Sequence, residues 1–72
     1  MNNSNVAKIQ LNGDPFEINI GLNLSELLNK LKIEKNKVAI EVNGEIVEQN
    51  KYSNLILNKD DKVEIVNFIG GG

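Results

Sequence analysis

One helix-type hydrophobic pattern, set between segments with strand-type patterns, limits the folds open to this chain. Four leucines follow the i, i+3, i+4, i+7 spacing of one helix face. They are Leu24, Leu27, Leu28 and Leu31. Asn23 precedes them and Glu26 stands three residues further on, which is the arrangement of a capping box. We expect one amphipathic helix of about two to three turns, whose leucines pack against a sheet.

The residues before the helix predict a β-hairpin. Residues 6–11 and 16–20 alternate between polar and apolar side chains, with Ile20 among those expected to point inward. The turn-forming residues 12–15 lie between them. Because Pro15 opens the second strand and has no N–H to donate, we expect this strand at an edge of the sheet.

The residues after the helix predict three more strands. Residues 38–42 and the short segment 46–47 flank Asn43-Gly44, a strong hairpin signal. Residues 49–54 are polar and are expected to be irregular. Residues 62–69 form the longest strand candidate and lead directly into the C-terminus.

This order of elements predicts an α+β fold. The most economical closure puts the last strand beside the first, at the centre of a mixed five-strand sheet covered on one face by the helix. That is the β-grasp, or ubiquitin-like, arrangement. We expect residues 1–69 to form a single domain and residues 70–72 to form a flexible glycine tail.

The composition excludes several classes of function. The 72 residues include no His and no Cys, so the chain lacks a thiol nucleophile, an imidazole base and a Cys/His metal site. We therefore expect a protein that is not itself an enzyme and holds no metal. The net charge of −2, with scattered lysines, argues against nucleic acid as a partner. No apolar run approaches the roughly 18 residues of a membrane span, and the polar N-terminus is unlike a secretory signal. We expect a cytoplasmic protein that is monomeric when alone.

The three C-terminal glycines are the feature that points to chemistry. A glycine tail adds no packing, and ordering it costs about 1–2 kcal/mol per residue. A chain without Cβ atoms can thread a narrow channel as an extended strand, so Gly70 and Gly71 can deliver the terminal carboxylate of Gly72 to a partner's active site. A carboxylate is a poor acylating agent. It must first be activated, most plausibly as an acyl-adenylate formed from ATP.

A docking surface is expected beside this tail. In the last strand, Val66 and Phe68 share the face opposite to the one that packs under the helix. Ala39 on the neighbouring strand can extend the exposed apolar area. Apolar residues grouped at a functional terminus suggest partner binding, although single exposed apolar residues are common and need no explanation.

Three segments of this sequence resemble the ThiS family, the sulfur-carrier proteins of thiamine biosynthesis. They are the hairpin Val42–Val47, the turn and strand Asp60–Val66, and the ending Ile69–Gly72. The segment Leu11–Pro15 is also similar to the first hairpin of that family. The resemblance covers the chain from about Val6 to Gly72.

The resemblance implies a mechanism and a set of partners. An E1-like adenylating enzyme of the ThiF type uses ATP and Mg²⁺ to adenylate the Gly72 carboxylate, and no cofactor is bound by the carrier itself. Sulfur drawn from cysteine by a desulfurase then replaces the AMP, giving a C-terminal thiocarboxylate. A ThiG-type thiazole synthase takes this sulfur into the thiazole ring. Gly71 and Gly72 correspond to the family's diglycine end, and Gly70 to an additional glycine of many members.

Three other functions remain open from the sequence. A MoaD-like small subunit of molybdopterin synthase uses the same thiocarboxylate chemistry but docks stably in a synthase. A ubiquitin-like modifier forms isopeptide bonds with lysines. An interaction domain with the same fold does not use its glycines at all.

Overall fold

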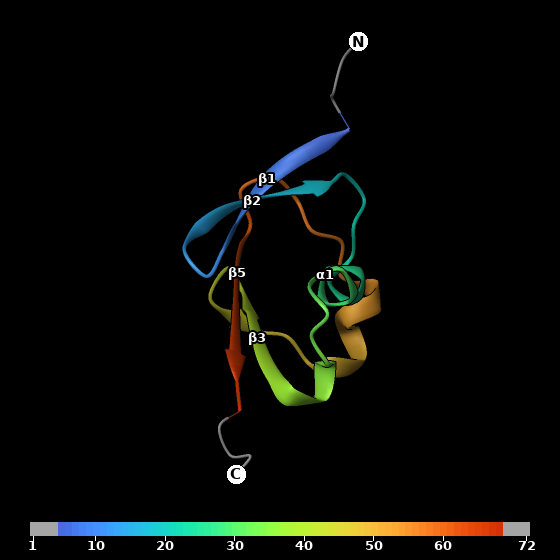
Figure 1. Ribbon diagram of the computed structural model, residues 1–72, viewed down its shortest axis with the longest axis vertical. Helices are drawn as coiled ribbons and strands as arrows, with labels where there is room; N and C mark the ends of the chain where they lie inside the picture. Colours follow the sequence, from blue (N-terminus) through green and yellow to red (C-terminus); the bar gives the residue numbers. More distant parts are fainter. Residues whose placement is uncertain (1–4, 69–72) are drawn as a thin grey trace.

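A five-stranded sheet with one face covered by a helix makes up residues 5–68, the part of the chain that this computed structural model describes (Figure 1). The strands lie in the order β2-β1-β5-β3-β4. The elements are β1 (Val6–Leu11), β2 (Asp14–Asn19), α1 (Leu24–Leu31), η1 (Lys35–Lys37), β3 (Val38–Val42), β4 (Glu45–Ile46), η2 (Gln49–Asn54) and β5 (Lys62–Asn67), where η denotes a 3₁₀ helix.

The strand pairing confirms the expected β-grasp fold. The last strand, β5, lies beside the first, and these two strands are parallel. The remaining neighbours, β1–β2, β3–β4 and β3–β5, pair antiparallel. The strand that contains Pro15 is at the edge of the sheet, as predicted, because no neighbour there requires the missing N–H.

The predicted capping box begins helix α1. The N–H of Glu26 donates to Oδ1 of Asn23 at 2.7 Å, and the N–H of Asn23 donates to Oε1 of Glu26 at 2.9 Å. These bonds satisfy backbone donors that the first turn leaves without an intrahelical partner. The helix ends at Lys32, which adopts a left-handed conformation with φ of 61°.

A small apolar core lies between the inner face of the sheet and the helix. Ten buried side chains form it: Ile9, Ile18, Leu24, Leu27, Leu28, Val38, Ile40, Tyr52, Leu57 and Val63. Fully burying one large aliphatic side chain stabilises a fold by about 1.5–3 kcal/mol. With no cysteines in the chain, this core is the main source of stability.

Two expectations about the periphery of the core are wrong. Ile20 does not point inward and is 63% exposed, because β2 ends at Asn19 and the chain turns away at Gly21, which has φ of 95°. The polar segment 49–54 is not irregular. It forms the 3₁₀ helix η2 and contributes the buried Tyr52 to the core. A single aromatic residue among polar neighbours has no periodicity that could reveal its burial.

Candidate functional site

Strand β5 leads the chain to its C-terminus along strand β3. Their antiparallel register places Val38 opposite Asn67 and Ala39 opposite Val66. The N–H of Phe68 then donates to the backbone oxygen of Lys37 at 3.0 Å. The chain is therefore held to β3 as far as Phe68. The predicted reactive tail, Gly70, Gly71 and Gly72, lies outside the described residues.

The three residues predicted to form a docking surface lie together on the outer face of the sheet, the face opposite to α1. Val66 is 56% exposed and Phe68 is 60% exposed. Ala39 is half-buried and sits directly across from Val66. The structure thus places them as expected, and their role in docking remains a prediction.

Ile46 also belongs to this surface, and the sequence analysis did not assign it there. It is 74% exposed and lies on the outer face because it pairs with Glu41, diagonally from Ala39. The signal was present in the two-residue turn Asn43-Gly44, since such a turn sets the register of its hairpin. We call Ala39, Ile46, Val66 and Phe68 the apolar patch.

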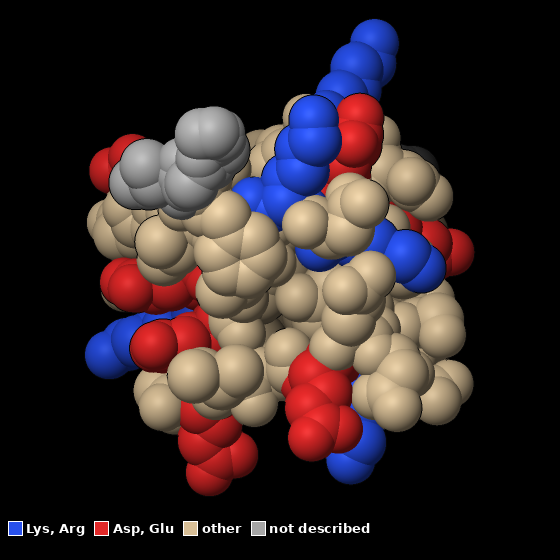
Figure 2. Space-filling view, turned by 90° about the horizontal axis from the view of Figure 1, so that it is seen from below, with Lys and Arg blue, Asp and Glu red and all other residues tan. Residues whose placement is uncertain are grey.

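Two carboxylates next to the apolar patch form no ion pair within residues 5–68. Glu41 and Glu64 are directly opposite each other in the β3–β5 register, an arrangement that destabilises a sheet. Within residues 5–68 the one ion pair joins Lys37 and Glu34 at 3.7 Å, so neither Glu41 nor Glu64 has an ion-pair partner there. Local departures of this kind are typical of functional surfaces. Figure 2, viewed from the end where β5 finishes, shows a broad uncharged area surrounded by charged side chains.

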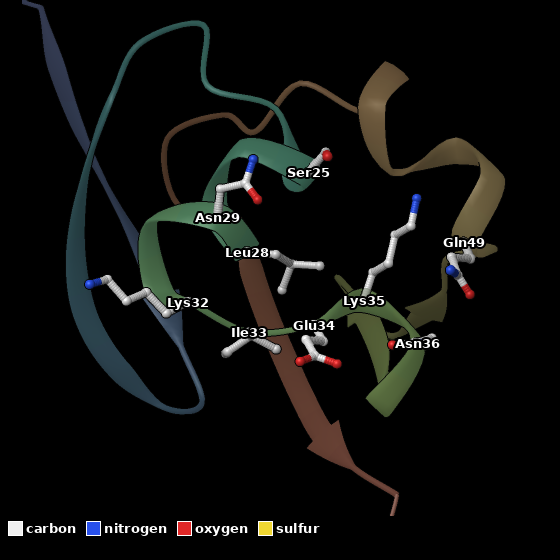
Figure 3. Close-up of a pocket in the computed structure, with 9 residues that line it drawn as sticks. All are labelled: Ser25, Leu28, Asn29, Lys32, Ile33, Glu34, Lys35, Asn36 and Gln49. Carbon is white, nitrogen blue, oxygen red and sulfur yellow. The ribbon is translucent and has the colours of Figure 1, made fainter.

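An open groove of about 630 Å³ lies near the C-terminal end of helix α1 (Figure 3). Leu28 and Ile33 line it together with polar side chains such as Lys32, Lys35 and Gln49. The two lysines point in different directions in Figure 3, so their ammonium groups do not converge on one point. This groove offers no set of converging polar groups for a small ligand.

The described residues also lack the features of a catalytic centre. In residues 5–68 no group of three acidic side chains is close enough to hold a metal ion. Burial raises the pKa of Tyr52, which lies in the core. None of the helices in that same range is long and apolar enough to cross a membrane.

Comparison with known proteins identifies the family. The family model described as "ThiS family" matches residues 9–72, a span that includes the three terminal glycines. The chain belongs to the ThiS family. A crystal structure of the thiamine biosynthesis protein ThiS from Geobacter metallireducens is 34% identical in sequence. It superposes with a TM-score of 0.79, covering 90% of this chain and 99% of that one.

Two relatives show different contexts for this ThiS-family sequence. The uncharacterized protein ycf40 of Porphyra purpurea is 39% identical over 72 residues, which is the full length of both chains. The thiazole synthase of Magnetococcus marinus is 43% identical over 65 residues. That match covers 90% of this chain but only 20% of the synthase, so the synthase chain is much longer than the region it shares.

Proposed function

We propose that this protein is the sulfur carrier of thiamine thiazole biosynthesis. The observation that carries the proposal is that the ThiS-family match runs through Gly72. The strand that precedes the glycines also supports it, because Val66 and Phe68 of the exposed apolar patch lie at the end of that strand.

The reactive group is the α-carboxylate of Gly72. An adenylating enzyme of the ThiF type, using ATP and Mg²⁺, joins AMP to this carboxylate and releases pyrophosphate. A persulfide supplied through a cysteine desulfurase then attacks the acyl carbon with its terminal sulfur, and AMP leaves. A second thiol reduces the resulting acyl disulfide, forming a disulfide with the sulfur that carried the persulfide. The product is a C-terminal thiocarboxylate. Thiazole synthase removes the sulfur into the thiazole ring, and water restores the carboxylate. The carrier contributes no acid, base or metal to these steps. It supplies the terminus and the docking surface.

The outer face of the sheet supports a particular kind of docking partner. The apolar patch favours a partner surface with an apolar centre. Glu41 and Glu64, which lie opposite each other and form no ion pair within residues 5–68, favour basic side chains at the edge of that surface. Such charges act mainly on the rate of association and on partner choice, so binding should weaken as salt is added.

The thiamine pathway is favoured over the alternatives that share this tail. A MoaD-like subunit of molybdopterin synthase and a ubiquitin-like modifier would both end in glycine. The family match and the similarity to the thiazole synthase of Magnetococcus marinus both point to thiamine. That similarity also supports thiazole synthase as the partner that receives the sulfur.

Intact-mass spectrometry tests the proposal. The protein is incubated with the adenylating enzyme, ATP, Mg²⁺ and a sulfur source, and we expect a mass gain equal to sulfur replacing one oxygen. A variant lacking Gly72 is the matched control and should show no gain. An unchanged wild-type mass, with an enzyme that is active on its own carrier, would overturn the proposal. A covalent adduct with a lysine-containing protein would support a modifier instead.

A further inference from the structure

The second half of β5 has a neighbouring strand on one side only. The parallel pairing with β1 joins Gln10 to Lys62 and Leu11 to Val63. It stops there because β1 ends at Leu11. The antiparallel pairing with β3 continues to Asn67. Figure 1 shows β5 running past the β1–β2 turn with β3 at its other side.

The backbone groups of β5 alternate between these two sides. The backbone groups of Lys62 and Phe68 point toward β3. The N–H of Asn43 donates to the backbone oxygen of Lys62, and the N–H of Phe68 donates to the backbone oxygen of Lys37. Residues at odd positions therefore direct their groups toward the β1 side. The N–H of Asn12 accordingly donates to the oxygen of Val63 at 2.9 Å.

The side chain of Asn12 bonds one more backbone N–H of β5, and the backbone groups after it on this side have no partner within residues 5–68. Its side-chain Oδ1 accepts the N–H of Ile65 at 2.8 Å. Beyond that bond, the oxygen of Ile65 and both the N–H and the oxygen of Asn67 have no partner among residues 5–68. Such a row of unpaired groups is a template for another strand, and natural proteins usually protect it with a proline, a lysine or a bulge. None of these interrupts residues 63–68.

We propose that this open edge, the backbone of Ile65 and Asn67, is a strand-addition site for thiazole synthase. An extended segment of the enzyme donates to the oxygen of Ile65 and accepts the N–H of Asn67, as in other cases of β-augmentation. The inference rests on the proposed function, because it assigns a binding mode to the partner that receives the sulfur.

The position of the edge explains the choice of occupant. In the sequence this edge lies a few residues before Gly72, so an enzyme that takes sulfur from Gly72 approaches it. Gly72 lies five positions after Asn67, which is at most about 17 Å of extended chain. A strand paired in fixed register with Asn67 would thus set how far the terminus reaches into the active site. The outer face alone offers side-chain contacts, which do not fix the chain along its own axis.

A proline substitution tests the backbone bond itself. Asn67→Pro removes the N–H at the open edge and leaves the bond from Phe68 to Lys37 in place. We expect about a five-fold loss of affinity for thiazole synthase, the effect of one net hydrogen bond. Asn67→Ala keeps the N–H and is the matched control, with affinity close to that of the wild type. Equal affinities of the two variants would overturn the proposal.

Amide exchange on the wild-type chain gives a second readout that requires no substitution. The free protein should exchange the Asn67 amide rapidly and the Phe68 amide slowly, because only the second is bonded within the chain. In the complex with thiazole synthase, the Asn67 amide should become protected. Rapid exchange of that amide in the complex would overturn strand addition. If the wild-type thiocarboxylate neither binds thiazole synthase nor transfers its sulfur, the proposed function fails, and this inference fails with it.

Discussion

At the scale of single residues, two exposed apolar side chains allow a controlled comparison. Phe68 is 60% exposed at the C-terminal end of β5, and Ile20 is 63% exposed beyond the end of β2. The parallel pairing of β1 with β5 places these two positions at opposite ends of the sheet. Only Phe68 lies within the apolar patch beside the predicted tail.

The substitution Phe68→Asp should separate docking from folding. We expect at least a ten-fold loss of partner affinity, because an aromatic anchor is replaced by a charge. The free energy of unfolding should change by no more than about 0.5 kcal/mol, since the side chain is exposed. Ile20→Asp is the control and should leave affinity unchanged. Calorimetric titration and thermal unfolding measure both quantities. A marked drop in melting temperature for Phe68→Asp would remove this residue from the docking surface.

Tyr52 should make the fold sensitive to alkaline pH. Its burial raises the pKa above the ordinary value of 10.0. As pH rises, the unfolded chain loses the phenolic proton before the folded protein does. The contribution of Tyr52 to the free energy of unfolding is therefore complete below pH 10.0 and declines as pH rises toward the pKa of the folded protein. The slope is at most about 1.4 kcal/mol per pH unit, the value for one proton. Tyr52→Phe should abolish this contribution in denaturation measured between neutral and alkaline pH. An identical alkaline loss in both proteins would show that other groups cause it.

At the scale of elements, the β3–β4 turn also anchors the start of β5. Asn43 has φ of 53°, as a two-residue hairpin turn requires. Its Nδ2 donates to Oδ1 of Asp61, and its Oδ1 accepts the N–H of Lys62, each at 2.9 Å. Asp61 in turn accepts the N–H of Asn58 at 2.7 Å. The Asn-Gly pair predicted the turn, whereas the anchor depends on partners 18 and 19 residues further along the chain.

Two substitutions at Asn43 should separate the contribution of its side-chain hydrogen bonds to stability from that of its positive φ. Asn43→Gly keeps the positive φ accessible but removes both side-chain bonds, which should cost about 1–2 kcal/mol of unfolding free energy. Asn43→Ala should cost about 1 kcal/mol more, because alanine is strained at positive φ. Urea unfolding measures the two differences. If both variants were as stable as the wild type, the anchor would have no energetic role.

At the scale of the whole molecule, the buried core of residues 5–68 lies upstream of the C-terminal residues. Val63 is the last fully buried residue within that described range. The residues that follow contribute mainly to the outer face and to the pairing with β3. Folding and tail chemistry should therefore be separable.

Deleting Gly71 and Gly72 tests this separation. The melting temperature should stay within about one degree of the wild-type value, because every buried core residue of the described range 5–68 lies at or before Val63. The shortened protein should no longer accept sulfur in the mass-spectrometric assay. Calorimetry and the assay on the same sample measure both properties. Retained sulfur loading would place the reactive group elsewhere, and a large loss of stability would show that the tail belongs to the folded body.

Local patterns were enough to predict most of the elements. The leucine spacing and Asn23 predicted helix α1 with its cap, and the alternating strands with Asn43-Gly44 predicted both hairpins. These signals act between residues a few positions apart, so a single sequence contains them. The exposure of Val66 and Phe68 followed from the same alternation once the inner face of β5 was assigned.

The sequence by itself thus determined most of the elements, the β-grasp order and the glycine end on which the proposed function depends. Tertiary structure decided which residues meet on the surface. The opposition of Glu41 and Glu64 depends on the register of two strands far apart in the chain. The open edge at Asn67 exists because β1 ends at Leu11 while β5 continues beside β3. Neither strand's own residues specify where its neighbour stops, so only the assembled sheet reveals that edge.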